Sequence, residues 1–377
     1  LAKNNLGFLL YSMGKPDEAM PYCTAAMGGM RRVLGEEDRD TLTSIDNMAG
    51  VLQAQGKLAE AEPYRREVVA KRRKTLGDEH RETLVAISNL GFLLMAQGRF
   101  ADAEPLERET MATGRRVLGE DHPDVLISLI NLAWTLQNLG RASEAVPFLR
   151  ESWERSVRTL GAENPNTAVA GNNLGLLLQD LGHFEEAEKL LRDSLARRRR
   201  ILGEEHPDTM NSIGNLGRFL QQVGRIDDAE PLLREALARK RKVRGEDHPD
   251  TLTSLNNLGV LLQGQQKHSE ALQYFRSAME KCRTVLGPEH PNTLITTINT
   301  GATLLILGQA QEALDLLTSV ESAAHKVFTG SYAGWLGKCL LNIGRARTRL
   351  EQFAAAEPAL LQAHATILGL WGPEHRD

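Results

Sequence analysis

The fold is decided by residues 245–287, which read GEDHPDTLTSLNNLGVLLQGQQKHSEALQYFRSAMEKCRTVLG. This stretch begins with a short acidic loop and a His-Pro pair, and two apolar-periodic segments separated by a polar break follow. The glycine that opens it recurs at a constant step of 42 residues, at Gly35, Gly77, Gly119, Gly161, Gly203, Gly245 and Gly287. Self-similarity at such a fixed period is typical of a solenoid, in which each unit packs mainly on its neighbours.

Each unit contains two segments with the periodicity of an amphipathic helix. In residues 77–118 the first segment places Leu84, Ile87, Leu90 and Leu94 at helical spacing, and residues 101–118 form the second. A turn with a glycine joins them, which predicts a helical hairpin, and no window alternates with period two. We therefore expect an all-α fold, a single solenoid over residues 1–377. Its approximate units are 1–34, 35–76, 77–118, 119–160, 161–202, 203–244, 245–286, 287–329 and 330–371, with 372–377 starting a further unit.

Prolines and charges indicate where the helices begin and end. Pro123, Pro207, Pro249 and Pro291 fit the first position of a helix, where a missing N–H costs nothing, and the residue before each is held outside the α region. The second helix of a unit has carboxylates at its start and Arg or Lys at its end, which suits the helix dipole. A further proline inside several second helices predicts a late start or a slight kink, at Pro63, Pro105, Pro147, Pro231 and Pro358.

Small residues at fixed places predict close contact between the two helices of a unit. The second segment carries an alanine every 42 residues from Ala19 to Ala313, and the first carries Gly or Ala at the matching positions from Gly7 to Gly301. Glycine inside a helix costs about 1 kcal/mol relative to alanine, so its recurrence requires a packing reason.

The composition argues against several classes of protein. Charged residues make up 25% of the chain and the net charge is −4, which gives no global reason to expect binding to nucleic acid or membranes. The three cysteines form no CxxC pair, so we expect no zinc site, no disulfide framework and a reducing, cytoplasmic location. No apolar run reaches the length of a membrane span, and we recognise no signal peptide. Because both ends fall inside the repeat pattern, we expect a fragment of a longer protein, with additional domains possible.

These residues resemble a known repeat family. Leu-Gly in the first helix, Gly at the turn and Ala in the second helix match the tetratricopeptide repeat. The 42-residue length, the GxxHPxT loop, the NNLG-type segment and the EAEPLxRxA segment resemble the longer repeats of kinesin light chains. The resemblance covers nearly the whole chain and implies a right-handed superhelical solenoid of about nine hairpins with a concave groove. Two departures stand out: Gln266 replaces the turn glycine, and residues 327–337 lose the GxxHP loop and gain one residue.

One asparagine recurs in every first helix. The positions are Asn5, Asn47, Asn89, Asn131, Asn173, Asn215, Asn257, Asn299 and, after the inserted residue, Asn342. Each directly precedes the position, most often a leucine, that is expected to be buried, so we expect the amide at the edge of the concave surface, where it offers both a donor and an acceptor to a peptide backbone. The resemblance implies such a peptide-holding role for Asn89, Asn131, Asn173, Asn215 and Asn257. The alternative, that each asparagine ties adjacent repeats together, is compatible with it.

The neighbouring concave positions differ between units and are where specificity is expected. Units three to five offer Phe92, Met95, Ile127, Ile130, Trp134 and Leu176; unit six offers Arg218, Gln221 and Gln222; unit nine offers Lys338, Arg345 and Arg349. An apolar patch beside a basic one suits a short peptide with hydrophobic anchors and an acidic residue. We expect Trp134 and Arg218 to contribute to binding. The alternative is that Phe92 and Trp134 only pack between units.

The remaining motifs predict structure rather than chemistry. One histidine recurs per loop, at His80, His122, His206, His248 and His290, too far apart for a shared metal, so packing at the helix start is expected. The Arg runs are expected on a solvated outer face balanced by the GEE and GED loops, with binding of acidic partners or RNA as the weaker alternative. His375-Arg376-Asp377 resembles a kinase triplet, but no other kinase, hydrolase or nucleotide-binding motif accompanies it.

The sequence therefore predicts a protein-interaction module that has no catalytic residues, metal or cofactor and binds a protein or peptide partner. The alternative is a regulatory or sensor array of a multidomain signalling protein such as a kinase or a nucleotide-binding ATPase. We expect no membrane partner, and nucleic acid is the weakest option; it would require affinity that falls steeply with salt.

Overall fold

The computed structural model describes residues 2–371, and within them every regular element is a helix. The chain divides into two compact units, Leu1–Leu181 and Gly182–Asp377, which are described separately. The helices of the first unit are α1 (Ala2–Ser12), α2 (Pro16–Leu34), α3 (Arg39–Ala54), α4 (Leu58–Leu76), α5 (Arg81–Ala96), α6 (Phe100–Leu118), α7 (Pro123–Asn138), α8 (Ala142–Thr159) and α9 (Pro165–Asp180).

The second unit contains nine α-helices and a short 3-10 helix among its described residues. They are α10 (Phe184–Leu202), α11 (Pro207–Gln222), α12 (Ile226–Arg244), α13 (Pro249–Gly264), α14 (His268–Leu286), α15 (Pro291–Ile306), α16 (Ala310–Val327), η1 (Gly330–Tyr332), α17 (Ala333–Arg349) and α18 (Phe353–Trp371). None of the described helices is both long enough and apolar enough to cross a membrane.

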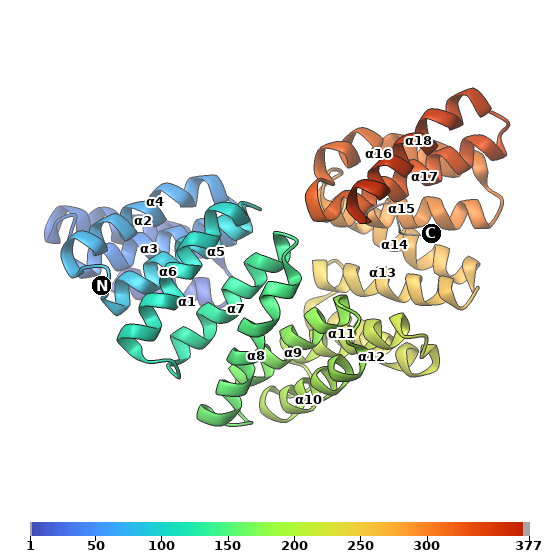
Figure 1. Cartoon of the computed structure of the whole chain (residues 1–377). Helices are drawn as coiled ribbons and strands as arrows, with labels where there is room; N and C mark the ends of the chain where they lie inside the picture. The colour runs from blue at the N-terminus through green and yellow to red at the C-terminus, as the bar shows by residue number, and fades with distance from the viewer. Residues whose placement is uncertain (1, 372–377) are drawn as a thin grey trace. The chain divides into compact units, whose positions relative to one another are not determined.

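Within each unit the helices form stacked hairpins (Figure 1). Inside a unit, an odd-numbered helix packs on the even-numbered helix that follows it, as α5 does on α6 and α13 on α14. Successive odd-numbered helices also touch one another, as α5 and α7, α7 and α9, and α13 and α15 do, so they form one layer and the even-numbered helices the other. The predicted all-α solenoid of helical hairpins is confirmed within each unit.

The helix starts confirm the predicted role of the loop histidines. His122 has an extended backbone (φ −69°, ψ 136°), and its Nδ1 accepts a hydrogen bond from the Asp124 N–H at 3.1 Å. His206, His248 and His290 cap their helices in the same way, each followed by proline at the first helical position. The imidazole thus satisfies one of the N–H groups that a helix start leaves unpaired.

The prediction of a late start at the internal prolines is wrong. Pro63 and Pro105 lie at the sixth residue of helices that begin at Leu58 and Phe100, and the same holds for Pro147, Pro231 and Pro358. A proline so close to the start removes a single N–H donor, and the first turn forms ahead of it.

Close helix contact at the small residues is confirmed. The recurring alanines of the second helices are fully buried, from Ala19 to Ala313. A Cβ at Gly217 would lie 2.9 Å from Leu233, and one at Gly259 would lie 2.7 Å from the Phe275 ring. These glycines therefore let a large side chain of the second helix reach the backbone of the first.

The two departures from the repeat pattern each have a local consequence. Gln266 occupies the turn in a left-handed conformation (φ 62°). The other turns of this type have glycine in this conformation, except the turn at Glu351, which also lacks glycine. Where the GxxHP loop is lost, η1 leads directly into α17, and Tyr332 makes no side-chain cap.

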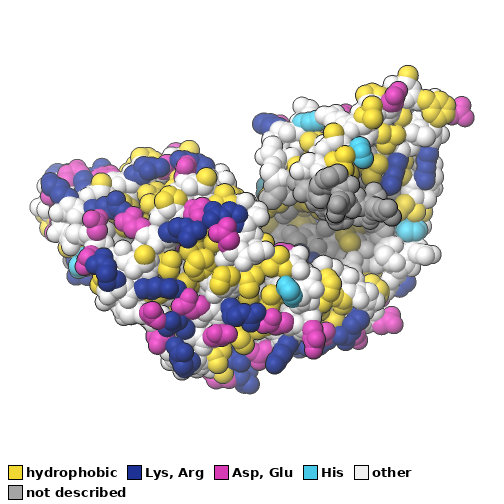
Figure 2. All heavy atoms as spheres, viewed as in Figure 1, with side chains coloured by type: hydrophobic (Ala, Val, Ile, Leu, Met, Phe, Trp, Pro, Cys, Tyr) yellow, Lys and Arg dark blue, Asp and Glu magenta, His cyan; other side chains and the backbone are white. Residues whose placement is uncertain are grey.

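The Arg and Lys runs are balanced by the acidic loops, as predicted, but the prediction that the runs lie on a solvated face is wrong for Arg72, Arg198 and Lys240, which are buried. Cations at the ends of second helices pair with loop carboxylates of the same repeat, in Lys74–Glu37, Arg116–Glu79, Arg158–Asp121, Lys242–Glu205 and Lys326–Glu289. On the face drawn in Figure 2, side chains of the two signs lie interspersed. Exposed pairs of this kind each contribute little to stability, about 0–1 kcal/mol.

Candidate functional site

The recurring asparagines do tie adjacent repeats together. Asn47 Nδ2 donates to Asn4 Oδ1 (3.2 Å), and Asn89 Nδ2 donates to Asp46 Oδ2 (3.0 Å). Asn131 donates to the Ser88 hydroxyl (3.4 Å) in the same way. In the second unit Asn299 donates to Asn256 Oδ1 (2.9 Å). The acceptor always lies 43 residues earlier, so we call this series of bonds the asparagine ladder.

The ladder is interrupted where the residue 43 positions earlier has no polar side chain. For Asn173 that residue is Ile130, and for Asn257 it is Gly214. Asn173 Oδ1 accepts a bond from Asn172 (3.3 Å), but within the described chain its Nδ2 has no acceptor. Asn173 therefore keeps a free amide donor at the surface.

Several predicted residues lie together around one hollow in the first unit, which we call the apolar hollow. It has a volume of about 440 Å³ and is formed by α5, α7, α8 and α9. Its walls are Phe92, Ile130, Asn131, Trp134, Gln137, Leu149, Asn173 and Leu176. Six of these eight residues were predicted as concave positions from the sequence. The repeat sets Phe92, Trp134 and Leu176 exactly one unit apart on successive first helices, so their side chains fall in line.

The large side chains of the apolar hollow are partly exposed and partly packed. Phe92 is 51% exposed and Trp134 is 42% exposed. The Trp134 ring also contacts Phe100 of the preceding repeat edge-on, with centroids 5.7 Å apart. Both alternatives considered for Trp134 therefore hold: its ring packs between repeats and also presents apolar surface to solvent. The prediction for Met95 is wrong, because its side chain is buried and accepts a hydrogen bond from Thr135.

The other predicted residues lie outside the apolar hollow. Asn89 and Ile127 line a smaller cavity between α5, α6 and α7. Arg218 and Gln221 belong to α11 in the second unit, where Arg218 Nη2 donates to Asn215 Oδ1 at 3.1 Å. Lys338, Arg345 and Arg349 of α17 line a separate hollow of about 770 Å³ within that unit, so the basic residues of the ninth repeat are also gathered.

Glu107 is a residue that the sequence analysis missed. Its side chain is fully buried in α6 against Gly91. Neither carboxyl oxygen accepts a hydrogen bond of normal length and angle within the described residues, and the Asn131 amide makes only a weak interaction with the carboxyl group. Burial raises the pKa of Glu107 to about 8, although the Asn131 amide opposes the shift. The repeat itself carries the signal that could have found it, because the same position holds Leu149 and Leu233 in other units.

No metal centre or reactive thiol is evident in the described residues. They contain no group of three or more His, Cys, Asp or Glu side chains placed to hold a metal ion. Cys23, Cys282 and Cys339 are buried and unpaired, and burial raises the pKa of the Cys282 thiol to about 11 and that of Cys339 to about 12. His375-Arg376-Asp377 lies outside the described residues.

Comparison with known proteins agrees with the repeat geometry. The family profile described as tetratricopeptide repeat matches residues 1–74, 40–112, 82–156, 137–200, 166–241, 208–283 and 261–326. The chain is a tetratricopeptide repeat protein. It is similar to a putative kinesin light chain from Podospora anserina with nearly identical TPR-like repeats, to which it is 30% identical. The match covers 54% of this chain and 96% of that one, with a TM-score of 0.48.

Two more distant solved structures share the fold of this tetratricopeptide repeat protein. A Rap protein complexed with competence and sporulation factor is 13% identical, with 98% of each chain covered and a TM-score of 0.63. A human IFIT1 dimer with m7Gppp-AAAA is 18% identical, with 96% of this chain and 76% of that chain covered and a TM-score of 0.59. Among curated proteins no sequence matches this one. At these identities the structural likeness shows the fold alone.

Proposed function

We propose that this tetratricopeptide repeat protein is a cytoplasmic interaction module without catalytic activity, which binds an extended peptide of a partner protein at the apolar hollow. The observation that carries the proposal is that Phe92, Ile130, Trp134 and Leu176 surround one open hollow, beside Asn173 with its free amide donor. Large, partly exposed aromatic side chains in a concave setting are the usual anchors of a peptide interface.

The division of roles follows from the chemistry of the walls. The aromatic and aliphatic side chains would take an apolar side chain of the peptide, because this removes apolar surface from water on both sides. The Asn173 amide would donate to a peptide carbonyl, because Ile130, 43 residues earlier, offers it no acceptor in the ladder. That the whole chain forms one solenoid, with a groove continuing past the first unit, stays a prediction.

Peptide selection followed by substitution tests the proposal. Peptides would be selected by display on the whole chain and their affinities measured by fluorescence polarisation. Trp134→Ala should weaken the selected peptides at least tenfold, since a central aromatic anchor typically contributes about 2 kcal/mol or more. Val260→Ala is the matched control, because Val260 has the same repeat position in the second unit and should leave the affinity unchanged.

A second substitution separates the two patches named from the sequence. Arg218→Ala should weaken only those peptides that carry an acidic residue, while Trp134→Ala should weaken all of them. If the double variant binds every selected peptide as tightly as the unaltered chain does, the assignment of the binding surface is wrong.

A further inference from the structure

A buried cation recurs at the fifteenth residue of several second helices. Each lies opposite a carboxylate on the second residue of the helix that follows. The three pairs are Arg72 with Glu82, Arg198 with Asp208, and Lys240 with Asp250. The cations are about nine-tenths buried or more. Arg72 and Arg198 also donate to the backbone carbonyl of their acidic partner, at 3.0 and 3.1 Å.

In two other repeats both the cation and the carboxylate are absent. Where the second position of the following helix is Asn166 or Asn292, the fifteenth residue is Ser156 or Cys282. A buried cation without an opposite charge is costly, so each buried cation at this position faces a carboxylate, whereas the carboxylate, which is more exposed, also occurs without the cation.

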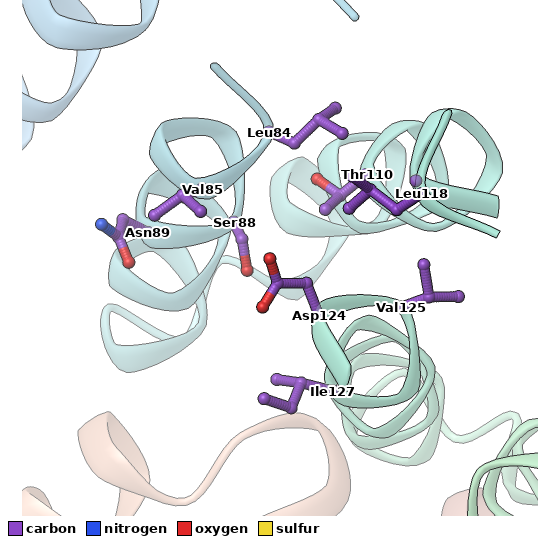
Figure 3. Close-up of a pocket in the computed structure, with 10 residues that line it drawn as sticks. Leu84, Val85, Ser88, Asn89, Thr110, Leu118, Asp124, Val125 and Ile127 are labelled. Carbon is purple, nitrogen blue, oxygen red and sulfur yellow. The ribbon is translucent and has the colours of Figure 1, made fainter. Parts of the chain in front are cut away.

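Two repeats of the first unit keep the carboxylate without the cation. In the earlier one, Asp40 is the second residue of α3, and the fifteenth residue of α2 is Met30, whose buried apolar side chain fills the place of the cation. In the later one no side chain fills that place. Asp124 stands at the second position of α7, but the fifteenth residue of α6 is Gly114. A cavity of about 150 Å³ occupies the space between α5, α6 and α7, and both residues line it. Figure 3 shows the Asp124 carboxylate pointing into this space toward Ser88.

Asp124 has an exposed ion-pair partner, Arg81, on its outer side, but Arg81 does not take the place of the missing buried cation on the inner side. Arg81 Nε donates to Asp124 Oδ2 at 2.7 Å, from a side chain that is largely exposed. The preceding repeat has the same outer pair, Arg39 with Glu82 at 2.5 Å, and still places Arg72 on the inner side. An acidic residue at this position therefore accommodates an outer and an inner cation together.

The walls of the cavity suit a positively charged group on a short alkyl stem. Leu84, Leu118 and Val125 supply apolar surface, and Ser88 and Thr110 supply hydroxyl groups (Figure 3). A cavity of roughly this volume holds a molecule the size of benzene. In their own repeats, Arg72 and Arg198 donate to the backbone carbonyl of the residue that corresponds to Asp124.

We propose that the cavity at Asp124 is a binding site for an alkylguanidinium group, supplied either by an arginine side chain of a partner polypeptide or by a free guanidino compound. The group enters between α5 and α7, stacks its stem on Leu84 and Val125, and places its charge on Asp124. This site is distinct from the apolar hollow and does not depend on it.

Methyl NMR of the whole chain tests the site with n-propylguanidinium, which reproduces the arginine side chain beyond its Cα. The methyl signals of Leu84, Val125 and Ile127 should shift saturably with this probe and not with the uncharged n-propylurea. Asp124→Asn should weaken the probe at least tenfold. That variant is expected to fold, because Asn166 and Asn292 hold the same position in this chain.

A second variant fills the cavity from within. Gly114→Arg is combined with Val125→Thr, because a Cβ at residue 114 would lie 3.1 Å from Val125 Cγ2 and threonine accompanies the arginine at residues 83 and 209. It should abolish the shifts. The absence of saturable shifts in the unaltered chain would overturn the proposal, and so would equal binding in the filled variant.

Display on both chains identifies the source of the group. If peptides selected on the unaltered chain are enriched in arginine and lose that enrichment on the filled variant, the guanidinium comes from a partner polypeptide. If the two selections are alike while n-propylguanidinium still binds at Asp124, the ligand is a small guanidino compound.

Discussion

Glu107 predicts a stability that depends on pH at one buried position. The folded state raises the pKa of this carboxyl from 4.5 to about 8, because burial disfavours the ionised form. The pKa is higher in the folded state, so the folded state binds more protons than the unfolded one between these values. Glu107 therefore destabilises the fold progressively as the pH rises from about 4.5 to 8, and not below that range.

The magnitude follows from the two pKa values. The stability lost relative to the protonated form is about 1 kcal/mol at pH 5, about 3 kcal/mol at pH 7 and about 4 kcal/mol at pH 8. Glu107→Leu should recover this free energy, because leucine holds the same position in other repeats, at Leu149, Leu233 and Leu317. A glycine of the first helix accommodates this leucine in two of them, Gly217 for Leu233 and Gly301 for Leu317. Glu107→Gln, which removes the charge and keeps the size, serves as the matched control.

The measurement is urea unfolding of the whole chain at pH 5, 6, 7 and 8, followed by tryptophan fluorescence for the unaltered chain and both variants. The difference between Glu107→Leu and the unaltered chain should grow by about 2 kcal/mol from pH 5 to pH 7, while the pH dependence of every other group cancels. A difference that stays constant over this range would refute the argument that Glu107 is buried and ionises at the expense of the fold.

Three further predictions concern the ladder and the backbone. Asn173→Asp removes the free amide donor and should weaken selected peptides severalfold, whereas Asn257→Asp, at the other interrupted position, should not; equal effects would count against a role in binding. Gln266→Gly should raise the free energy of unfolding by about 1 kcal/mol, measured with urea, because glycine adopts the left-handed turn without strain. Gly259→Ala should destabilise by overlap with the facing phenylalanine ring, whereas Gly264→Ala, which has open space, should be neutral or slightly stabilising.

Contacts between neighbouring repeats determine which side chains of the first unit stay accessible. Phe92 and Trp134 remain accessible because the ladder and the small residues hold the first helices side by side without covering the face that lines the apolar hollow. A sequence difference between repeats therefore changes which groups are free. Because Ile130 has no polar side chain, the Asn173 amide on the next repeat has no acceptor in the ladder.

The repeat length, the two helices per unit, the capping loops and the alignment of Phe92, Trp134 and Leu176 were determined by the sequence alone. These features depend on local periodicity and on backbone preferences of His-Pro and Gly, which act within a few residues. They are also copied several times, so each repeat supports the reading of the others.

Only the tertiary structure decided which side chains are enclosed and which groups they meet. Met95 is buried although its repeat position suggested exposure, Glu107 lacks a hydrogen bond of normal length and angle, and Gly114 leaves a cavity beside Asp124. The reason is that burial and hydrogen bonding at one position depend on the volume and polarity of residues in the adjacent helix, which a periodic pattern does not specify.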